Sequence, residues 1–258
     1  NSIGKKDEEK RKPQAQQAPK VEKSADAFCV RFFACKPLGE FMKPMTPKLP
    51  ETLTPVDNFL KFAKPYLDAE RAFAGIKTAP ARILEADFFR LEVRASVFSG
   101  LVAQNCAFEN TSFCDVLFED CNFSGCNFSD AYFERCVFLN CKAVGTNFTN
   151  ALLKDVRMTD SNFSYAVFDS GALRSFQTEN TNFSCASFSR AKWQKPECVG
   201  SVFSQNNLFQ ADLGGADFSE CTFEAPTISD PPKELRGVTV NAFQASELVG
   251  LFGIKVRT

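Results

Sequence analysis

The sequence predicts a repeat protein, because one pattern recurs every five residues across more than half of the chain. From Phe88 to Phe223, large apolar side chains return in one register over 27 steps of five, without insertion or deletion. Two residues before each central position the side chain is small, as at Cys106 and Thr111. A helix repeats near about 3.6 residues and a strand near about 2, so a period of five fits neither alone. The phenylalanines in this register are Phe88, Phe98, Phe108, Phe113, Phe118, Phe123, Phe128, Phe133, Phe138, Phe148, Phe163, Phe168, Phe183, Phe188, Phe203, Phe218 and Phe223.

This pattern resembles the pentapeptide-repeat family, and the resemblance covers the stretch from Ile83 to Phe223. The family forms a right-handed quadrilateral β-helix with four repeats per coil. The resemblance therefore implies an all-β fold of about seven coils, in which the central and small positions both point inward. It also implies that residues twenty apart stack, so that Phe128 lies between Phe108 and Phe148.

The repeat register divides the chain into four predicted parts. Residues 1–27 are a disordered charged tail, because their composition cannot bury enough apolar surface to fold alone. Residues 28–80 are an N-terminal extension with a capping helix. Residues 81–225 are the repeat domain, and residues 226–258 supply a C-terminal strand and a second capping helix. Both helices are expected to cover the open ends of the β-helix, where uncovered backbone groups would favour aggregation.

The first capping helix is predicted over residues 54–75. Thr54 can cap its N-terminus, Pro55 suits the first helical position, and Gly75 can terminate it. Pro65 is expected to kink or split this helix. Upstream, Cys29 and Cys35 flank a short apolar run that we interpret as core packing.

The C-terminal cap is predicted from a short strand over residues 235–240 and a helix beginning at the N-cap Asn241. Gln244, three residues later, completes a capping box, and Gly253 ends the helix. This stretch resembles the C-terminal cap of bacterial quinolone-resistance-type pentapeptide proteins. The resemblance implies a possible homodimer through the cap, and its apolar residues are Phe243, Leu248, Leu251 and Phe252.

The composition bears on membrane association and on the cellular compartment of the chain. No apolar run is long enough to span a membrane, so we expect no membrane span. Most of the 11 cysteines occupy inward positions of the repeat, and we interpret them as free thiols with a structural role. Free thiols indicate a reducing compartment, the cytoplasm or an organellar interior. The chain begins at Asn1 and not at Met, which leaves a removed targeting segment open.

No catalytic constellation is visible. The chain has no His, no Gly-rich phosphate loop, no serine nucleophile motif and no metal-ligand spacing, so we expect no catalytic, cofactor or metal site and no small-molecule substrate. Two functions stay open. One is a non-enzymatic rod that docks a protein partner or stabilises a larger assembly. The other, implied by the quinolone-resistance-type resemblance, is an acidic DNA mimic that binds a type II topoisomerase such as gyrase.

Charge bears on that choice. Residues 81–225 carry 11 basic and 18 acidic side chains, a net charge of −7, whereas residues 1–80 carry 15 basic and 10 acidic side chains, a net charge of +5. The rod is therefore acidic, and the positive excess of the N-terminal part is too dilute to predict direct nucleic-acid binding.

The regularity weakens at one place, which we predict to be a partner-binding face. Phe176 fills a small position, Pro196 fills the equivalent position twenty residues later, and the lone Trp193 lies beside them. Because Phe is too large for a narrow interior, we expect this face to bulge outward. The residues expected near the surface are Phe176, Lys192, Trp193 and Lys195.

Overall fold

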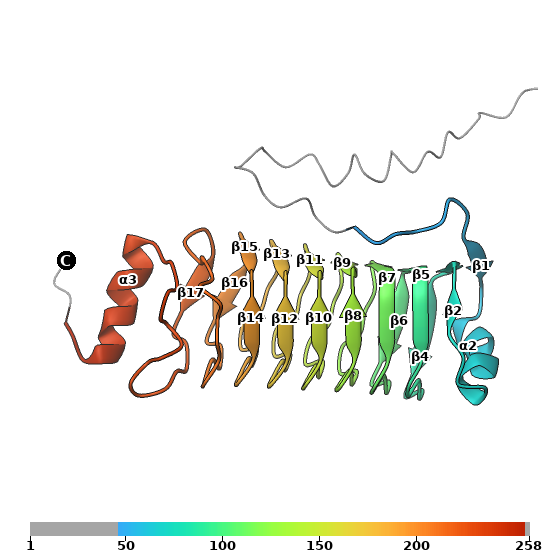
Figure 1. Cartoon of the computed structure of the whole chain (residues 1–258), viewed down its shortest axis with the longest axis horizontal. Coiled ribbons are helices and arrows are strands. Elements are labelled where there is room, and N and C mark those ends of the chain that lie inside the picture. Colours follow the sequence, from blue (N-terminus) through green and yellow to red (C-terminus); the bar gives the residue numbers. More distant parts are fainter. Residues whose placement is uncertain (1–45, 256–258) are drawn as a thin grey trace, which may run out of the picture. The chain divides into compact units, whose positions relative to one another are not determined.

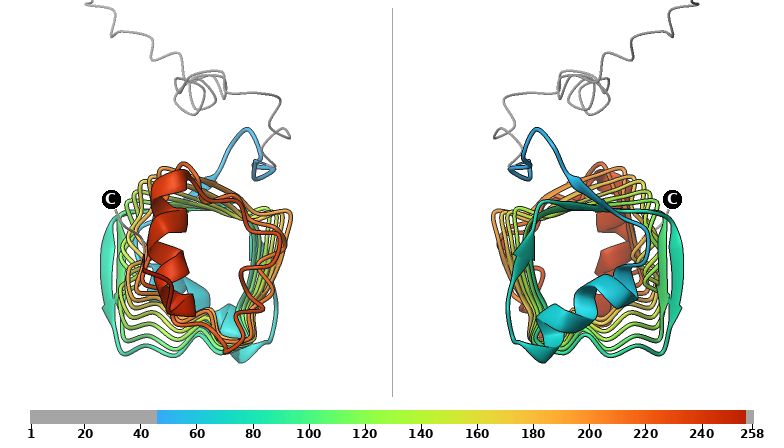
Figure 2. Two further views of the ribbon diagram at one scale, coloured as in Figure 1. Left: turned by 90° about the vertical axis from the view of Figure 1, so that its left-hand side faces the viewer. Right: turned by 90° about the vertical axis from the view of Figure 1, so that its right-hand side faces the viewer.

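The computed structural model describes residues 46–255, so the predictions for residues 1–27 and for Cys29 and Cys35 lie outside the described residues. The described chain is a right-handed quadrilateral β-helix. Figure 1 shows short parallel strands stacked along one axis, and Figure 2 shows the nearly square outline of the coils seen from each end. No helix within residues 46–255 is long and apolar enough to cross a membrane.

The five-residue period has a backbone origin. Each side of a coil is a short extended segment, and the second residue after each central residue turns the corner with a positive φ, as at Asn110 (57°) and Asp130 (59°). Such left-handed geometry is costly for most L-residues and least so for Gly, Asn and Asp. These three residue types occupy many of the corners. The corner geometry therefore explains why Gly, Asn and Asp recur two residues after the central position, which the apolar register alone does not explain.

The predicted twenty-residue register is confirmed. Strand pairing places Phe133 beside Phe113 and Leu153 beside Phe133, and every coil-to-coil pair is parallel. The described strands are β1 (Thr54–Val56), β2 (Phe73–Ala74), β3 (Ile76–Thr78), β4 (Ala81–Leu84), β5 (Glu92–Ser99), β6 (Leu101–Gln104), β7 (Ser112–Glu119), β8 (Tyr132–Glu134), β9 (Val137–Leu139), β10 (Leu152–Lys154), β11 (Arg157–Thr159), β12 (Ala172–Arg174), β13 (Gln177–Glu179), β14 (Lys192–Gln194), β15 (Glu197–Val199), β16 (Val202–Ser204) and β17 (Thr222–Glu224). We call the side formed by β8, β10, β12 and β14 the β8 side, and the side formed by β9, β11, β13 and β15 the β9 side.

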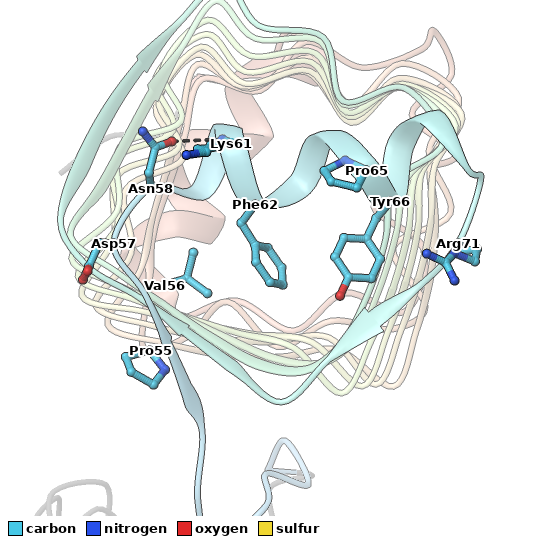
Figure 3. A pocket seen from close by; sticks show the side chains of 9 residues that line it. All are labelled: Pro55, Val56, Asp57, Asn58, Lys61, Phe62, Pro65, Tyr66 and Arg71. Atoms are coloured by element: carbon cyan, nitrogen blue, oxygen red, sulfur yellow. Dashed lines mark hydrogen bonds between the residues drawn. The ribbon is translucent and has the colours of Figure 1, made fainter.

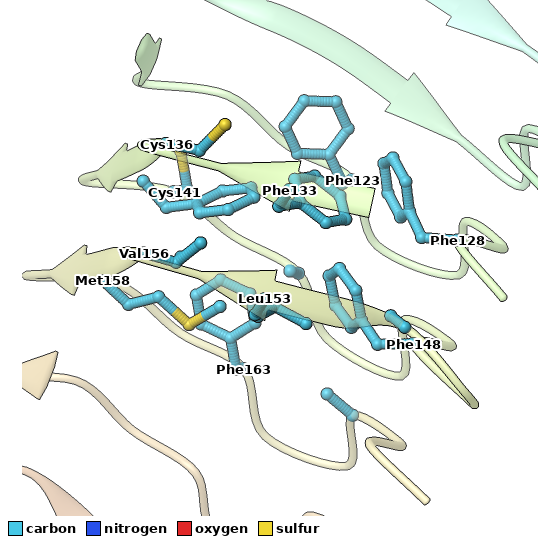
Figure 4. Packing of buried hydrophobic residues seen from close by; sticks show 14 of the residues in the cluster. Phe123, Phe128, Phe133, Cys136, Cys141, Phe148, Leu153, Val156, Met158 and Phe163 are labelled. Carbon is cyan, nitrogen blue, oxygen red and sulfur yellow. The ribbon is translucent and has the colours of Figure 1, made fainter. Parts of the chain in front are cut away.

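Stacked aromatic rings fill the core, as predicted. Phe108 lies 4.7 Å from Phe128 and Phe128 lies 5.3 Å from Phe148, measured between ring centroids, with the planes within 7° of parallel. Figure 4 shows how rings from neighbouring sides fill the space between these columns. All of these rings are buried. Offset stacking of this kind stabilises each pair by about 1 kcal/mol beyond burial.

The small inward residues do more than fill space. Cys121 donates its thiol hydrogen to the carbonyl of Phe98 (3.4 Å), Cys126 donates to Ala103 (3.1 Å), and the Thr146 hydroxyl donates to Phe123 (2.8 Å). Each acceptor lies 23 residues earlier, on the preceding coil. The polar small residues therefore tie one coil to the next by hydrogen bonds, a role that the apolar-filler interpretation of the cysteines did not include. All nine cysteines among the described residues are free.

The predicted number of seven coils is too low, because the solenoid has about nine. Coiling begins before residue 81: β1 pairs with β3, and Phe73 in β2 pairs with Val93. In these first coils the register is interrupted, because Thr78 fills a central position and α2 precedes Phe73, so the sequence pattern did not reveal them. At the other end Thr239 pairs with Asp217, 22 residues away, because the last coil carries an excursion that breaks the register.

Helix α2 (Phe59–Asp68) begins later and ends earlier than predicted. Its N-cap is Asn58, whose side chain accepts from the backbone N–H of Lys61 at 2.9 Å, whereas Thr54 and Pro55 lie in β1. The helix runs through Pro65 as one element and does not split. It lies across the N-terminal end of the coils, where Phe59 packs on Phe98 at a centroid distance of 5.1 Å (Figure 2).

The C-terminal end is covered by helix α3 (Ala242–Leu248), which continues as the 3-10 helix η1 (Val249–Phe252). The predicted capping box between Asn241 and Gln244 is present, and Gly253 ends the helix in a left-handed conformation. The predicted strand over residues 235–240 is wrong. Residues 235–237 form a turn, and a single bridge at Thr239 is all that pairs the stretch with the coils.

Candidate functional site

The predicted outward bulge at Phe176 and Trp193 is absent. Phe176 is 0% exposed and Trp193 is 1% exposed, and their rings meet edge-to-face inside the coil at a centroid distance of 5.7 Å. The backbone bond from Glu197 to the carbonyl of Phe176 is intact at 2.9 Å, so Pro196 does not break the coil. Only Lys192 and Lys195 are exposed, and the four residues do not form an aromatic surface patch.

The physical reason is that neighbouring positions share one interior volume. Where Phe176 is larger than a small position normally allows, the centre two residues later is only Thr178, and Cys198 follows on the next coil. Gly171 and Ala191 occupy the small positions around Trp193. Core side chains of compensating size keep the packing density, so the coil stays regular.

The C-terminal cap divides the predicted dimer residues into two groups. Leu248 is buried against the last coil, whereas Phe243, Leu251 and Phe252 are 72%, 49% and 55% exposed, and Ile254 is 57% exposed. The other large exposed hydrophobic residues of the described chain are Leu60 in α2 and Leu84, Phe89, Tyr165 and Phe209 on the coils. We call Phe243, Leu251, Phe252 and Ile254 the cap patch. Four exposed apolar side chains within the twelve residues from 243 to 254, at the end of a rod, are the kind of surface that marks an interface.

Beneath the cap patch, polar side chains replace the coil that would follow. Gln244 is buried and donates from Nε2 to the carbonyls of Phe218 (3.0 Å) and Cys221 (2.7 Å). Asn241 donates from Nδ2 to the carbonyl of Ser219 at 2.9 Å. These carbonyls belong to the last complete coil, where a following strand would otherwise bond them. The helix therefore ends the solenoid chemically as well as sterically.

Glu234 satisfies backbone N–H donors near this end, as Gln244 and Asn241 satisfy carbonyl acceptors. Its Oε1 accepts from the backbone N–H of Gln210 at 2.6 Å and from the Ser229 hydroxyl, while Oε2 accepts from the Ser229 backbone N–H at 3.2 Å. Burial acts to raise the pKa of this carboxyl, but the hydrogen bonds from Ser229 and from backbone N–H groups outweigh it and lower the pKa below its usual value. A buried carboxylate that accepts this many bonds is a structural group, with no free oxygen for chemistry.

The N-terminal end carries a shallow hollow of about 530 Å³ between β1 and α2 (Figure 3). The rings of Phe62 and Tyr66 form its floor, with centroids 5.1 Å apart, and the Arg71 guanidinium lies 5.9 Å from the Tyr66 ring. Lys61 and Asp57 lie on its rim. The hollow combines aromatic surface with cations, residue types that are suited to binding.

A network of charges lines the β8 side. Glu134 accepts from Lys154 Nζ at 2.8 Å and from the Tyr132 hydroxyl at 2.9 Å. Arg135 holds Asp115 with two bonds of 2.7 and 2.8 Å. The bond from Lys154 is the main cause that lowers the pKa of Glu134, and burial with the nearby Glu134 raises the pKa of Tyr132 to about 12. Since each charge has a partner, this network stabilises the sheet and leaves no reactive group.

The five Asn-Phe-Ser/Thr triplets of the sequence also have a structural role. In each, the Asn side-chain oxygen accepts the backbone N–H two residues later, as from Ser124 to Asn122 (3.0 Å) and from Thr149 to Asn147 (3.0 Å). This is the Asx turn that Asn favours at corners. Within residues 46–255, no three His, Cys, Asp or Glu side chains gather closely enough to hold a metal ion.

Comparisons with known proteins agree with this geometry. Residues 111–183 match the family described as "Pentapeptide repeat region", and residues 197–224 match "Pentapeptide repeats (8 copies)". These two stretches are pentapeptide repeats, as the repeat pattern of the sequence predicted. No curated protein matches it in sequence.

Several solved structures are similar to the chain. Trypsin-treated QnrB1, a plasmid-mediated fluoroquinolone resistance protein, aligns with a TM-score of 0.49 and 21% identity over 72% of this chain and 90% of its own. HetL, from the cyanobacterium Nostoc, aligns with a TM-score of 0.37 and 14% identity over 68% and 94%. Rfr23, from the cyanobacterium Cyanothece, aligns with a TM-score of 0.20 and 10% identity over 70% and 99%. At such identities, likeness says nothing about function.

Proposed function

We propose that this chain is a non-enzymatic protein-interaction module, a rigid rod that docks a protein partner or stabilises a larger assembly. The observation that carries this proposal is the cap patch, because the large apolar side chains of the solenoid are mostly buried in its core whereas those of the cap are exposed. Exposed Phe and Leu side chains that cluster at one end are suited to become the buried centre of an interface.

The first occupant proposed for the cap patch is a second copy of the chain. The same patch on two molecules gives a two-fold symmetric contact, which closes on itself and forms a dimer. In sedimentation velocity, the unaltered chain is expected to sediment as a dimer and the double variant Phe243→Ser/Phe252→Ser as a monomer. Phe89→Ser is the control, because Phe89 is also exposed but lies on the coils. A monomeric unaltered chain at micromolar concentration would contradict the dimer.

Other protein partners are tested by affinity capture with the full chain and with a chain lacking residues 1–27. Capture with Phe243→Ser/Phe252→Ser is the third arm, so that dependence on the cap patch is separated from dependence on residues 1–27. We propose no small-molecule substrate, cofactor or direct nucleic-acid contact. Because the described cysteines are free and mostly buried, we also propose a reducing compartment.

A second candidate function is that of an acidic DNA mimic that binds a type II topoisomerase. The net charge of −7 over residues 81–225 favours it, since a rod of regular negative charge can compete with DNA for a basic channel. The purified chain would then protect or inhibit DNA gyrase in a supercoiling assay. No effect at micromolar concentration removes this candidate and leaves the first.

A further inference from the structure

One stretch of the rod surface carries buried apolar side chains at a position of the repeat that is polar or half-exposed on other sides. Val97, Leu117 and Val137 lie one above another, in the position immediately before a central residue. Because side chains alternate along a strand, this position points away from the interior. The three side chains are nevertheless only 5%, 1% and 3% exposed, whereas Leu152 and Val167, at the same position on other sides, are half-buried. Something therefore lies over this stripe, which continues into the β9 side.

The described segment over this surface is residues 46–53, which we call the strap. Figures 1 and 2 show it running along the outside of the coils above this side. The backbone N–H of Lys48 donates to Asp115 Oδ1 at 2.9 Å, and a Cβ on Gly75 would lie 4.0 Å from Pro50. Gly75 and Asp115 occupy the same corner two coils apart, so the strap follows the corner that borders the stripe.

The strap is held by few directional contacts. Pro47 and Leu49 are half-buried while Lys48 and Pro50 are exposed, which is the alternation of an extended segment with one face on a surface. The two prolines have no N–H to donate. Within residues 46–53, the bond from Lys48 to Asp115 is the one hydrogen bond that reaches the coils. A segment that rests on apolar contact and one hydrogen bond opens more readily than the strands beneath it.

Asp115 acts as the latch of the strap. Besides Lys48 it accepts both bonds from Arg135, which fix the carboxylate in place. Asp155 occupies the same corner two coils further on, beyond the strap, with the same left-handed backbone (φ 56°, against 58° at Asp115). Asp155 is therefore a matched control position, because it has the backbone geometry of Asp115 but accepts no hydrogen bond from Lys48.

We propose that residues 46–53 are a releasable strap over a docking surface formed by Val97, Leu117 and Val137. The partner that this surface takes is an extended segment of another protein with Pro and Leu at alternate positions, because the strap itself shows what chemistry the surface accepts. This inference rests on the proposed interaction function and names one surface and one kind of partner for it.

The first experiment measures opening of the strap in the full chain. Trypsin cleaves after Lys48, and cleavage requires the strap to leave the surface. The rate at this bond is expected to rise about tenfold in Asp115→Ala, because the latch bond to a charged acceptor is lost. Asp115→Asn, which keeps an acceptor, should give a smaller rise, and Asp155→Ala should leave the rate unchanged. Equal rates in Asp115→Ala and Asp155→Ala would overturn the latch.

The second experiment tests the surface with a defined probe, a fluorescent synthetic peptide of residues 46–55. The full chain with Leu49→Asp, in which the resident strap is weakened, should bind the peptide about tenfold more tightly than the unaltered chain, because the competing segment is displaced. Adding Leu117→Asp should abolish that binding, with the far-ultraviolet circular dichroism spectrum confirming a folded rod. Equal binding by all three chains would refute the docking surface.

Different results would contradict the proposed interaction function and the proposed docking surface beneath the strap. A chain that forms the cap dimer but does not bind the peptide loses only the strap surface. Peptide binding by the Leu49→Asp chain without any dimer or captured partner leaves the surface in place and removes the broader proposed function.

Discussion

At the scale of single residues, position within the five-residue period decides burial more reliably than residue type does. Phe128 fills a central position, whereas Phe89 follows a central position by one residue. Phe128 is buried between two stacked rings, and Phe89 is 48% exposed. Hydrophobicity alone would place both inside. The register separates them, because Phe128 fills a position that faces the interior and Phe89 does not.

This contrast gives a quantitative prediction. Phe128→Ala should lower the free energy of unfolding by about 3–5 kcal/mol, because it leaves a cavity in a column that the neighbouring coils hold apart. Phe148→Ala should act similarly, whereas Phe89→Ala should change stability by less than about 1 kcal/mol. Denaturant unfolding curves measure all three. A loss below about 1 kcal/mol for both core variants would be incompatible with the inward register.

Glu234 gives a prediction about pH. Its pKa is lower in the folded chain than in the unfolded chain, so the ionised form stabilises the fold above the unfolded pKa. That stability is lost as pH falls below the ordinary value of 4.5 and through the folded pKa. Melting temperatures from pH 7 to pH 3 should therefore drop less steeply in Glu234→Gln than in the unaltered chain. Parallel curves would show that Glu234 does not report on folding.

At the scale of elements, the two ends are protected by different means. At the N-terminal end, Pro55 lies in the outermost strand β1, where it offers no N–H to an added strand, and α2 covers the rings below. At the C-terminal end, α3 brings the donors of Gln244 and Asn241 onto carbonyls that receive no N–H from a further strand. Both devices stop the stack without requiring a regular last coil.

Gln244→Ala should therefore lower stability by about 1–3 kcal/mol, since it leaves two buried carbonyls without this donor. The matched control is Ser246→Ala on the same helix, whose exposed hydroxyl bonds only to Phe243 within the helix. Hydrogen exchange should show faster opening of the final coils in the first variant and not in the second. Identical exchange in both would mean that the helix covers the end by apolar contact alone.

At the scale of the whole molecule, one continuous core runs from Val56 in the first coil to Leu248 in the C-terminal helix. Each coil contacts only its neighbours, so access to the interior depends on the stack remaining closed. The thiols inside test this property. Burial raises the pKa of Cys221 to about 11 and also raises the pKa of Cys136 and Cys198, which lowers their reactivity further.

The native chain should thus react slowly with a thiol reagent at most cysteines, with the half-buried Cys114 and Cys185 modified first. The denatured chain should expose all 11 thiols. Rapid labelling of Cys136 and Cys141 in native protein, followed by mass spectrometry, would contradict a closed stack.

The sequence by itself determined the repeat, its twenty-residue stacking, the inward phenylalanines and the capping box at Asn241, because each depends on spacing along one chain. It could not place Phe176, because the room for that ring comes from Thr178, Cys198 and other side chains whose volumes add only in three dimensions. It missed the first coils, because Thr78 fills the central position after Phe73 and α2 interrupts the repeat before it. The strap on Asp115 was likewise decided by tertiary structure alone, since contacts between residues 67 positions apart leave no periodic trace in the sequence.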